Sequence, residues 1–137
     1  MPKPSAIAIG AHPDDIEFYM AGTLLQLQAV GWTIHYFNLS SGNLGSVKMP
    51  PEKTARTRAK EARQAARVLG ATYHCSICRD LEILYTVPML RKVAAAIRKS
   101  KASIVLTHSP VDYMEDHTTS CRLAVTAAFT HGMPNFK

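Results

Sequence analysis

Apolar and polar residues alternate along this chain in two rhythms, which predict strands and helices in turn. Residues 4–11 form a continuous apolar run of small and β-branched residues, typical of a buried strand, and residues 32–39 alternate as a second strand. Between them, residues 16–30 carry apolar side chains at helical spacing and are followed by Gly31, a common helix end. The remaining predicted elements are helices at 51–69, 87–99 and 117–130 and strands at 71–78 and 103–108.

Four strands joined by helices predict an α/β fold, with a parallel doubly wound sheet between two helical layers. In common sheets of this kind the first and fourth strands are neighbours where the strand order reverses, which gives the order 3-2-1-4. At 137 residues, one domain spanning residues 1–137 is expected. No strand follows the last predicted helix, so we expect either a four-stranded domain or the N-terminal part of a longer one.

Charge and hydropathy narrow the classes of partner. The net charge of +6 comes from 16 basic and 10 acidic residues, and the basic residues cluster in two predicted helices without interleaved aromatic residues. Such helices are typical of solvated outer faces rather than of a nucleic-acid surface. No apolar run is long enough to cross a membrane, and the start of the chain lacks the apolar region of a signal peptide. We therefore expect a cytoplasmic protein that binds neither nucleic acid nor membranes.

Three cysteines, an odd number in a chain without a secretory signal, do not predict a disulfide framework. Cys75 and Cys78 have C-x-x-C spacing, but they fall within a predicted strand, where residues three apart point to opposite faces. The pair also does not open a helix, as a redox pair normally does. We therefore expect both to be small buried residues.

The first motif with chemical character is Ala11-His12-Pro13-Asp14-Asp15, directly after the first predicted strand. Ionisable side chains at the end of a buried strand are costly unless they are paired or bind a cation. Histidine and aspartate are ligands that zinc accepts, and the second carboxylate would then be free to handle protons. The alternative is that Asp14 or Asp15 only caps the helix that follows.

The second motif, residues 107–117, follows the fourth predicted strand. Ligands of doubly wound sheets bind outside the carboxyl ends of the strands that flank the reversal point, so this loop and the His12 loop should meet in one crevice. His12, Asp15 and His117 would supply two nitrogens and one carboxylate and leave a position open for water, as catalytic zinc sites do. The alternative for His117 is a surface role, and Asp116 is expected to cap the helix that follows and also to orient a neighbour.

These two motifs, in this order and about a hundred residues apart, resemble the PIG-L/LmbE family of zinc-dependent N-deacetylases. The resemblance implies a Rossmann-like fold, of which this chain covers the N-terminal part, and hydrolysis of acetamido groups on sugars such as N-acetylglucosamine conjugates. It assigns His12, Asp15 and His117 as ligands of Zn²⁺ or another divalent transition metal. It also assigns Asp14 as the general base towards the metal-activated water.

The resemblance extends to two further positions and departs from the family at one. Arg58 and Glu61 match an Arg-x-x-Glu helix pattern whose arginine faces the substrate, although a solvated basic helix face would also explain Arg58. Asn43 stands in a glycine-flanked loop where relatives place a sugar-contacting glutamate, although it could serve only the loop backbone. Met114 replaces a histidine that stabilises the oxyanion in many relatives, and its side chain donates no hydrogen bond. That role would fall to the metal, to another residue such as His108, or to a segment outside this chain.

The function that these residues predict is metal-dependent removal of an N-acetyl group from a small amino-sugar conjugate. The alternatives are a non-catalytic metal-binding member of the same fold and an amidohydrolase that acts on another acylated small molecule. A nucleotide-binding module is disfavoured, because two carboxylates at the first strand–helix turn would repel a pyrophosphate. An exposed sheet edge would also allow association into a homo-oligomer.

Overall fold

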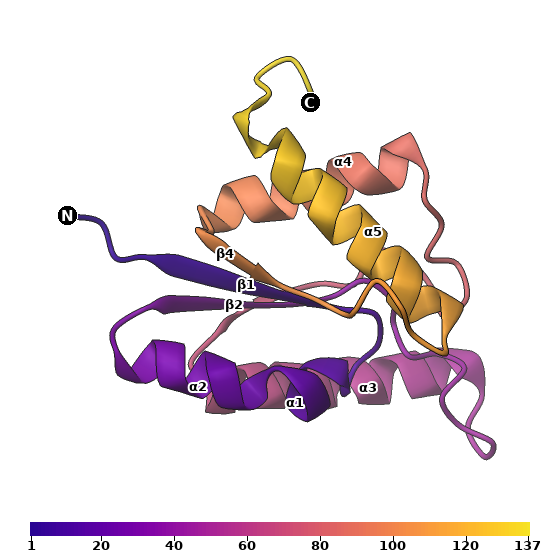
Figure 1. The fold of residues 1–137 in the computed structure, drawn as a ribbon. Helices are drawn as coiled ribbons and strands as arrows, with labels where there is room; N and C mark the ends of the chain where they lie inside the picture. Colours follow the sequence, from indigo (N-terminus) through magenta and orange to yellow (C-terminus); the bar gives the residue numbers. More distant parts are fainter.

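The computed structural model describes residues 1–137 and contains a four-stranded parallel sheet with helices on both faces (Figure 1). The strand order is β3-β2-β1-β4, which confirms the predicted order 3-2-1-4. The long register between the two central strands runs from Ser5↔Thr33 to Gly10↔Asn38. The strands are β1 (Ser5–Gly10), β2 (Thr33–Asn38), β3 (Thr72–His74) and β4 (Ile104–Leu106).

Five α-helices form the two outer layers of the sandwich. In Figure 1, α1, α2 and α3 lie below the sheet, and α4 and α5 lie above it. A short 3-10 helix, Thr130–Gly132, follows the last α-helix. The α-helices are α1 (Asp15–Tyr19), α2 (Ala21–Ala29), α3 (Pro51–Val68), α4 (Val87–Ser100) and α5 (Glu115–Phe129).

The strand β1 separates two apolar cores because successive side chains of a strand point to opposite faces. Ala6 and Ala8 face the core formed with α1, α2 and α3, and Ile7 and Ile9 face the core formed with α4 and α5. All six residues of β1 are buried. This two-sided burial explains why the β1 sequence is a continuous apolar run rather than an alternating one. It also places the first charged motif of the chain at the end of a buried strand.

The predicted helix over residues 16–30 forms as two helices that meet at Met20, whose backbone leaves the helical region with φ −128°. Ile16, Met20 and Leu24 nevertheless remain buried in one core. The last helix begins at Glu115 rather than at His117. His117 therefore lies in the first turn of α5, with its backbone already fixed by the helix.

The predicted strand over residues 71–78 is wrong in its second half. Only Thr72–His74 pair regularly with β2. The chain then runs on beside the end of β2, where Cys78 bridges to Ser40 in parallel and the N–H groups of Ile77 and Cys78 both donate to the Leu39 carbonyl. Cys75 is exposed and Cys78 is half-buried, which corrects the expectation that both are buried. All three cysteines are free thiols.

Two histidines, His35 on β2 and His74 on β3, contact each other. Nδ1 of His35 lies 2.9 Å from Nε2 of His74, and both side chains are half-buried. Burial lowers the pKa of His35, and burial together with the neighbouring His35 lowers the pKa of His74 to about 4. The folded state therefore holds this pair neutral, with one ring donating to the other.

We predict that this pair makes the fold sensitive to acid. Unfolded histidine titrates near 6.5, so between pH 6.5 and about 4 the unfolded chain binds more protons than the folded one. The free energy of unfolding should therefore fall as the pH drops through this window. Urea denaturation at pH 7 and pH 5 measures the difference, and His74→Gln should reduce it. Equal pH dependence in the wild type and in His74→Gln would contradict the prediction.

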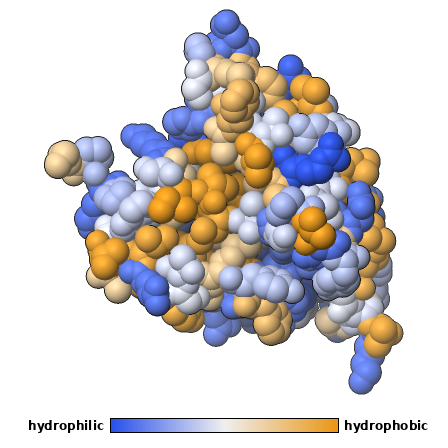
Figure 2. Space-filling model, viewed as in Figure 1, coloured by the Kyte–Doolittle hydropathy of each residue, from blue (hydrophilic) through white to orange (hydrophobic).

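The outer edge of the sheet at β4 is apolar. β4 pairs only with β1, and its three residues, Ile-Val-Leu, are all half-buried. In Figure 2, hydrophobic side chains gather around this edge, between α5 and α2. An unpaired apolar edge can pair with a strand of another chain. We therefore keep association into a homo-oligomer as a prediction. None of the helices has the length and apolar character that crossing a membrane would require.

Candidate metal centre and pocket

The loop after β1 turns sharply and sends its two aspartates in different directions. Asp14 has φ +114°, a left-handed conformation that is strained for any residue except glycine. The His12 N–H donates to Oδ2 of Asp15 at 2.8 Å, and the Asp15 N–H returns to the His12 carbonyl at 3.2 Å. Asp15 is 5% exposed, whereas the Asp14 side chain is 44% exposed. The strained turn thus separates a buried carboxylate from an accessible one.

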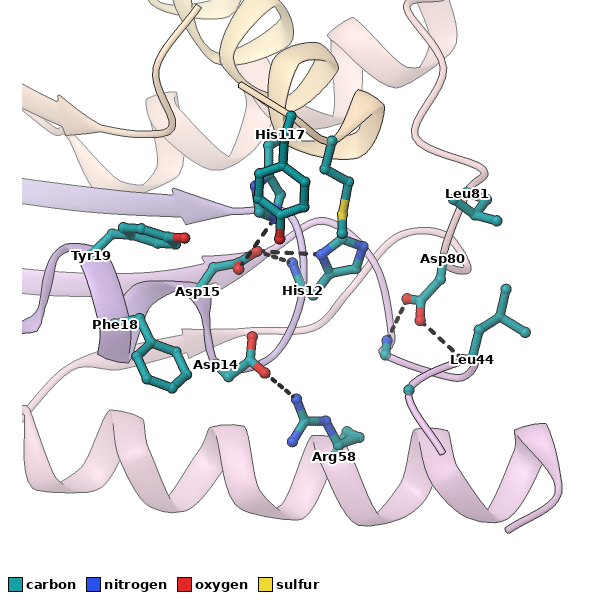
Figure 3. Close-up of a pocket in the computed structure, with 14 residues that line it drawn as sticks. His12, Asp14, Asp15, Phe18, Tyr19, Leu44, Arg58, Asp80, Leu81 and His117 are labelled. Atoms are coloured by element: carbon teal, nitrogen blue, oxygen red, sulfur yellow. Dashed lines mark hydrogen bonds and ion pairs between the residues drawn. The ribbon is translucent and has the colours of Figure 1, made fainter. Parts of the chain in front are cut away.

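The structure brings the three predicted metal ligands together, although they come from the two ends of the chain (Figure 3). Oδ2 of Asp15 lies 3.4 Å from Nδ1 of His12, and Oδ1 lies 3.3 Å from Nε2 of His117. One ligand atom from each residue lies within 4.8 Å of the others. Two imidazole nitrogens and a carboxylate at these separations can bind one divalent cation. The cluster is therefore consistent with a metal site.

Each of the two histidines contacts a second carboxylate through the ring nitrogen that does not face Asp15. Nε2 of His12 lies 2.8 Å from Oδ2 of Asp116, and Nδ1 of His117 lies 3.1 Å from Oδ1 of Asp112. A carboxylate keeps a proton on the nitrogen that it contacts, so Asp116 and Asp112 direct the other ring nitrogens, Nδ1 of His12 and Nε2 of His117, towards a metal. These nitrogens are the two that face Asp15, and a metal would displace any proton that they carry.

Asp116 therefore orients a neighbour, and the expectation that this residue mainly caps the helix is wrong. Met114 stands at the N-cap position of α5, and Asp116 lies inside the helix with 2% exposure. Asp14 does occupy the N-cap position of α1, but its side chain makes no capping hydrogen bond. No role was predicted from the sequence for Asp112, which orients His117. Its place in the second motif, five residues before His117, could have indicated this role.

Hydrogen bonds within the cluster raise the pKa of His12 and lower the pKa of Asp15. Burial alone would lower the pKa of His12, but hydrogen bonds to Asp15 and Asp116 raise it to about 9. Burial would raise the pKa of Asp15, but hydrogen bonds to the surrounding imidazoles and to the His12 amide hold it well below its usual range. Without a metal, His12 is therefore a cation at neutral pH, and its positive charge lies where a metal ion would bind.

We predict that metal binding displaces a proton from His12. Because the metal needs a neutral nitrogen, the apparent zinc affinity should rise about tenfold per pH unit below pH 9 and level off above it. Calorimetry in buffers of different ionisation enthalpy should detect about one proton released per zinc at pH 7. Asp116→Asn should move the levelling-off to lower pH, because it removes one of the groups that raise the pKa. A zinc affinity that does not vary between pH 6.5 and 9 would contradict this assignment.

His108 lies behind the cluster rather than in the pocket. The Ala11 N–H donates to its Nε2 at 3.0 Å, and its side chain is 2% exposed. It therefore cannot reach a substrate, which removes it as a replacement for the histidine that Met114 displaces. His108, Asp112 and His117 form a second group with metal-ligand spacing. However, the two rings stack at 4.1 Å and 11°, so no nearby point lies in both ring planes, as in-plane coordination requires.

A pocket of about 600 Å³ opens over the cluster. Arg58 on α3 lines it, and its Nη2 donates to Oδ2 of Asp14 at 2.7 Å and to the Pro13 carbonyl. Oδ1 of Asp14 makes no hydrogen bond within the chain. Arg58 also contacts Oε2 of Glu61 at 3.1 Å. The lining residues are His12, Asp14, Asp15, Phe18, Tyr19, Gly42, Leu44, Gly45, Arg58, Asp80, Leu81, Tyr113, Met114 and His117.

Asn43 does not line this pocket. It is 5% exposed, and its Oδ1 accepts hydrogen bonds from the Asp80 N–H at 2.8 Å and from Oγ of Ser41 at 3.2 Å. Its side chain therefore serves the loop, and the substrate contact expected of Asn43 has no support in this geometry. Asp80 faces the pocket instead, and it was missed because it lies in an irregular segment with no motif around it.

Comparison with known proteins identifies the family. Residues 7–129 match the model of PIG-L, described as GlcNAc-PI de-N-acetylase, so the chain belongs to the PIG-L family. Among curated proteins, the 4-oxalmesaconate hydratase of Pseudomonas putida is 28% identical over 134 residues, which cover 92% of this chain and 52% of the relative. The chain thus spans about half the length of this curated relative.

Two solved structures share the fold, each at 27% sequence identity. N,N′-diacetylchitobiose deacetylase from Pyrococcus horikoshii has a TM-score of 0.89 and 27% identity, over 96% of this chain and 52% of that one. GalB, the 4-carboxy-2-hydroxymuconate hydratase of Pseudomonas putida, has a TM-score of 0.86 and 27% identity, over 98% of this chain and 61% of that one. The relatives are enzymes of two reaction types, deacetylation and hydration.

Proposed function

We propose that this chain carries the catalytic centre of a zinc-dependent hydrolase that removes an N-acetyl group from an amino-sugar conjugate. The observation that carries the proposal is the Asp14 carboxylate. It is accessible from the pocket beside three metal-ligand side chains, and one of its oxygens makes no hydrogen bond within the chain. A free carboxylate next to a metal-ligand set is the arrangement that metal-assisted hydrolysis requires.

The donor set fits zinc. His12, Asp15 and His117 would hold the ion, and two nitrogens with one carboxylate form a common catalytic zinc set. Asp112 and Asp116 already fix the two rings with the correct nitrogens inward. When bound, zinc would lower the pKa of water and polarise a carbonyl group.

The chain's own residues then supply proton transfer. Oδ1 of Asp14 accepts the proton of the attacking water as the water oxygen bonds to the acetyl carbon. The same oxygen returns the proton to the departing amine when the carbon–nitrogen bond breaks, which yields acetate and a free amino sugar. Arg58 fixes Oδ2 of Asp14 at 2.7 Å and so directs the other oxygen into the pocket.

The charge of the pocket favours an uncharged amide over a polycarboxylate. Asp14, Asp15 and Asp80 line it, and the guanidinium of Arg58 is already paired with Asp14 and Glu61. One hydratase relative is named for a carboxylated muconate. The metal would neutralise the Asp15 carboxylate that binds it, but Asp14 and Asp80 stay negative and the guanidinium of Arg58 is committed to Asp14, so a substrate with several carboxylates would find no free side-chain cation here. Hydroxyl groups of a sugar can instead donate to these carboxylates.

Assays of the zinc-loaded chain with two kinds of substrate test the proposal. We expect acetate release from N-acetylglucosamine conjugates, loss of this activity with a chelator and its recovery when zinc is added back. Hydration of 4-oxalmesaconate should be absent. Hydration without acetate release would assign the chain to the hydratases of its family, and zinc binding without either activity would support a non-catalytic metal-binding protein.

A further inference from the structure

The carboxylate of Asp80 fastens the loop that forms one wall of the pocket. Its Oδ1 accepts hydrogen bonds from Oγ of Ser40 at 2.8 Å and from the Gly42 N–H at 2.7 Å, and its Oδ2 accepts from the Leu44 N–H at 3.0 Å. Asn43 in the same loop accepts from the Asp80 N–H. Hydrogen bonds to an ionised group are the stronger kind, so Asp80 and this loop are held as one unit.

The next residue connects this unit to the metal cluster. The Leu81 N–H donates to Oδ2 of Asp116 at 2.9 Å, and the same oxygen lies 2.8 Å from Nε2 of His12. Leu81 has φ +64°, a strained conformation for leucine, and its side chain is 69% exposed. Burial of the side chain therefore does not explain the strained backbone, whereas the direction of the N–H towards Asp116 does.

We propose that Asp80 is a positioning residue for the metal ligand His12, acting through the Leu81 N–H and Asp116. By holding the turn at Asp80 and Leu81, the carboxylate fixes the donor that orients Asp116, and Asp116 in turn fixes the ring of His12. The wall of the pocket and the geometry of the metal site are thereby linked, although no atom of Asp80 or Leu81 belongs to the ligand set. This inference rests on the proposed function only in requiring a metal at His12, Asp15 and His117.

Asp80→Asn tests the proposal, with zinc alone as the probe. An asparagine has one oxygen and one NH₂ group in place of the two carboxylate oxygens. Its NH₂ group must therefore face a donor, either the Leu44 N–H or the Gly42 N–H and Ser40 hydroxyl, so hydrogen bonds between residue 80 and the loop are lost. We expect its zinc affinity, measured by competition with a chromophoric chelator, to fall about fivefold or more. Glu82→Gln removes the exposed carboxylate two residues along the chain and should leave the affinity unchanged.

Two further measurements separate positioning from a general loss of structure. The visible spectrum of bound Co²⁺ reports ligand geometry, and it should change in Asp80→Asn but not in Glu82→Gln. In a double-mutant cycle with Asp116→Asn, the losses of zinc affinity should be clearly less than additive, because both changes act on the same connection. If Asp80→Asn does not fold, Asn43→Ala removes the acceptor of the Asp80 N–H and should lower the affinity by a smaller factor.

An affinity of Asp80→Asn within about twofold of the wild type, with an unchanged Co²⁺ spectrum, would overturn the inference and leave the proposed function intact. Additive losses in the double-mutant cycle would also overturn it, because Asp80 would then not act through Asp116. A wild-type chain that binds no zinc would overturn both proposals.

Discussion

Asp14→Asn should lower the kcat/KM for acetate release by about 10²- to 10⁴-fold, the usual contribution of a general base, while zinc still binds. Asparagine cannot accept the proton of the attacking water, yet it has nearly the shape of aspartate. Asparagine also adopts left-handed backbone about as readily as aspartate, so the substitution adds no strain at φ +114°. The three side chains of the metal-ligand set stay in place. The measurement is acetate release and zinc stoichiometry on the same sample.

Glu61→Gln is the matched control for this substitution. Glu61 also pairs with Arg58, at 3.1 Å, but it does not line the pocket. Both variants remove one ion pair from Arg58, and an exposed pair of this kind contributes little to stability. Glu61→Gln should therefore keep most of the activity. Full activity of Asp14→Asn, or equal losses in the two variants, would contradict the assignment of Asp14 as the base.

The sheet could be predicted because its determinants are local. The continuous apolar run of β1 and the helical spacing of the segments between strands indicate element types directly, and chain connectivity then restricts the strand order. The end of β3 could not be predicted in this way. Residues 75–78 have strand-like composition, but the regular pairing with β2 stops at His74, and the Leu39 carbonyl then accepts from both Ile77 and Cys78. This is a tertiary contact without a sequence signal.

The same difference between local determinants and tertiary contacts applies to the candidate site. His12, Asp15 and His117 follow the carboxyl ends of neighbouring strands, so topology alone predicts that they meet. Asp80 and the buried side chain of Asn43 depend instead on how two irregular loops pack against each other. Asp116 was expected mainly to cap the helix, because an aspartate next to a helix start is a favoured cap, but the same residue can also be the partner of a distant imidazole. Only the position of His12 relative to α5 decides between these roles.

Met114→His should raise the kcat/KM for acetate release, by up to about 10²-fold, the scale of a single oxyanion donor. Met114 lines the pocket beside His117 and stands at the N-cap of α5 with an extended backbone, which histidine adopts equally well. The pocket now offers no hydrogen-bond donor at this position, so the side chain of residue 114 cannot share the charge of a tetrahedral oxyanion. An imidazole N–H placed there would share the negative charge.

A graded series distinguishes hydrogen bonding from an added metal ligand. Met114→Gln supplies an amide donor that binds zinc poorly and should give a smaller increase, while Met114→Leu keeps the apolar shape and should match the wild type. Zinc affinity is measured in parallel, because a new imidazole near His117 could also capture the ion. A rise in affinity without a rise in turnover would mean that the histidine acts as a ligand. Unchanged turnover in both the histidine and glutamine variants would mean that charge on the oxygen is already stabilised without a donor at position 114, and that Met114 does not limit the reaction.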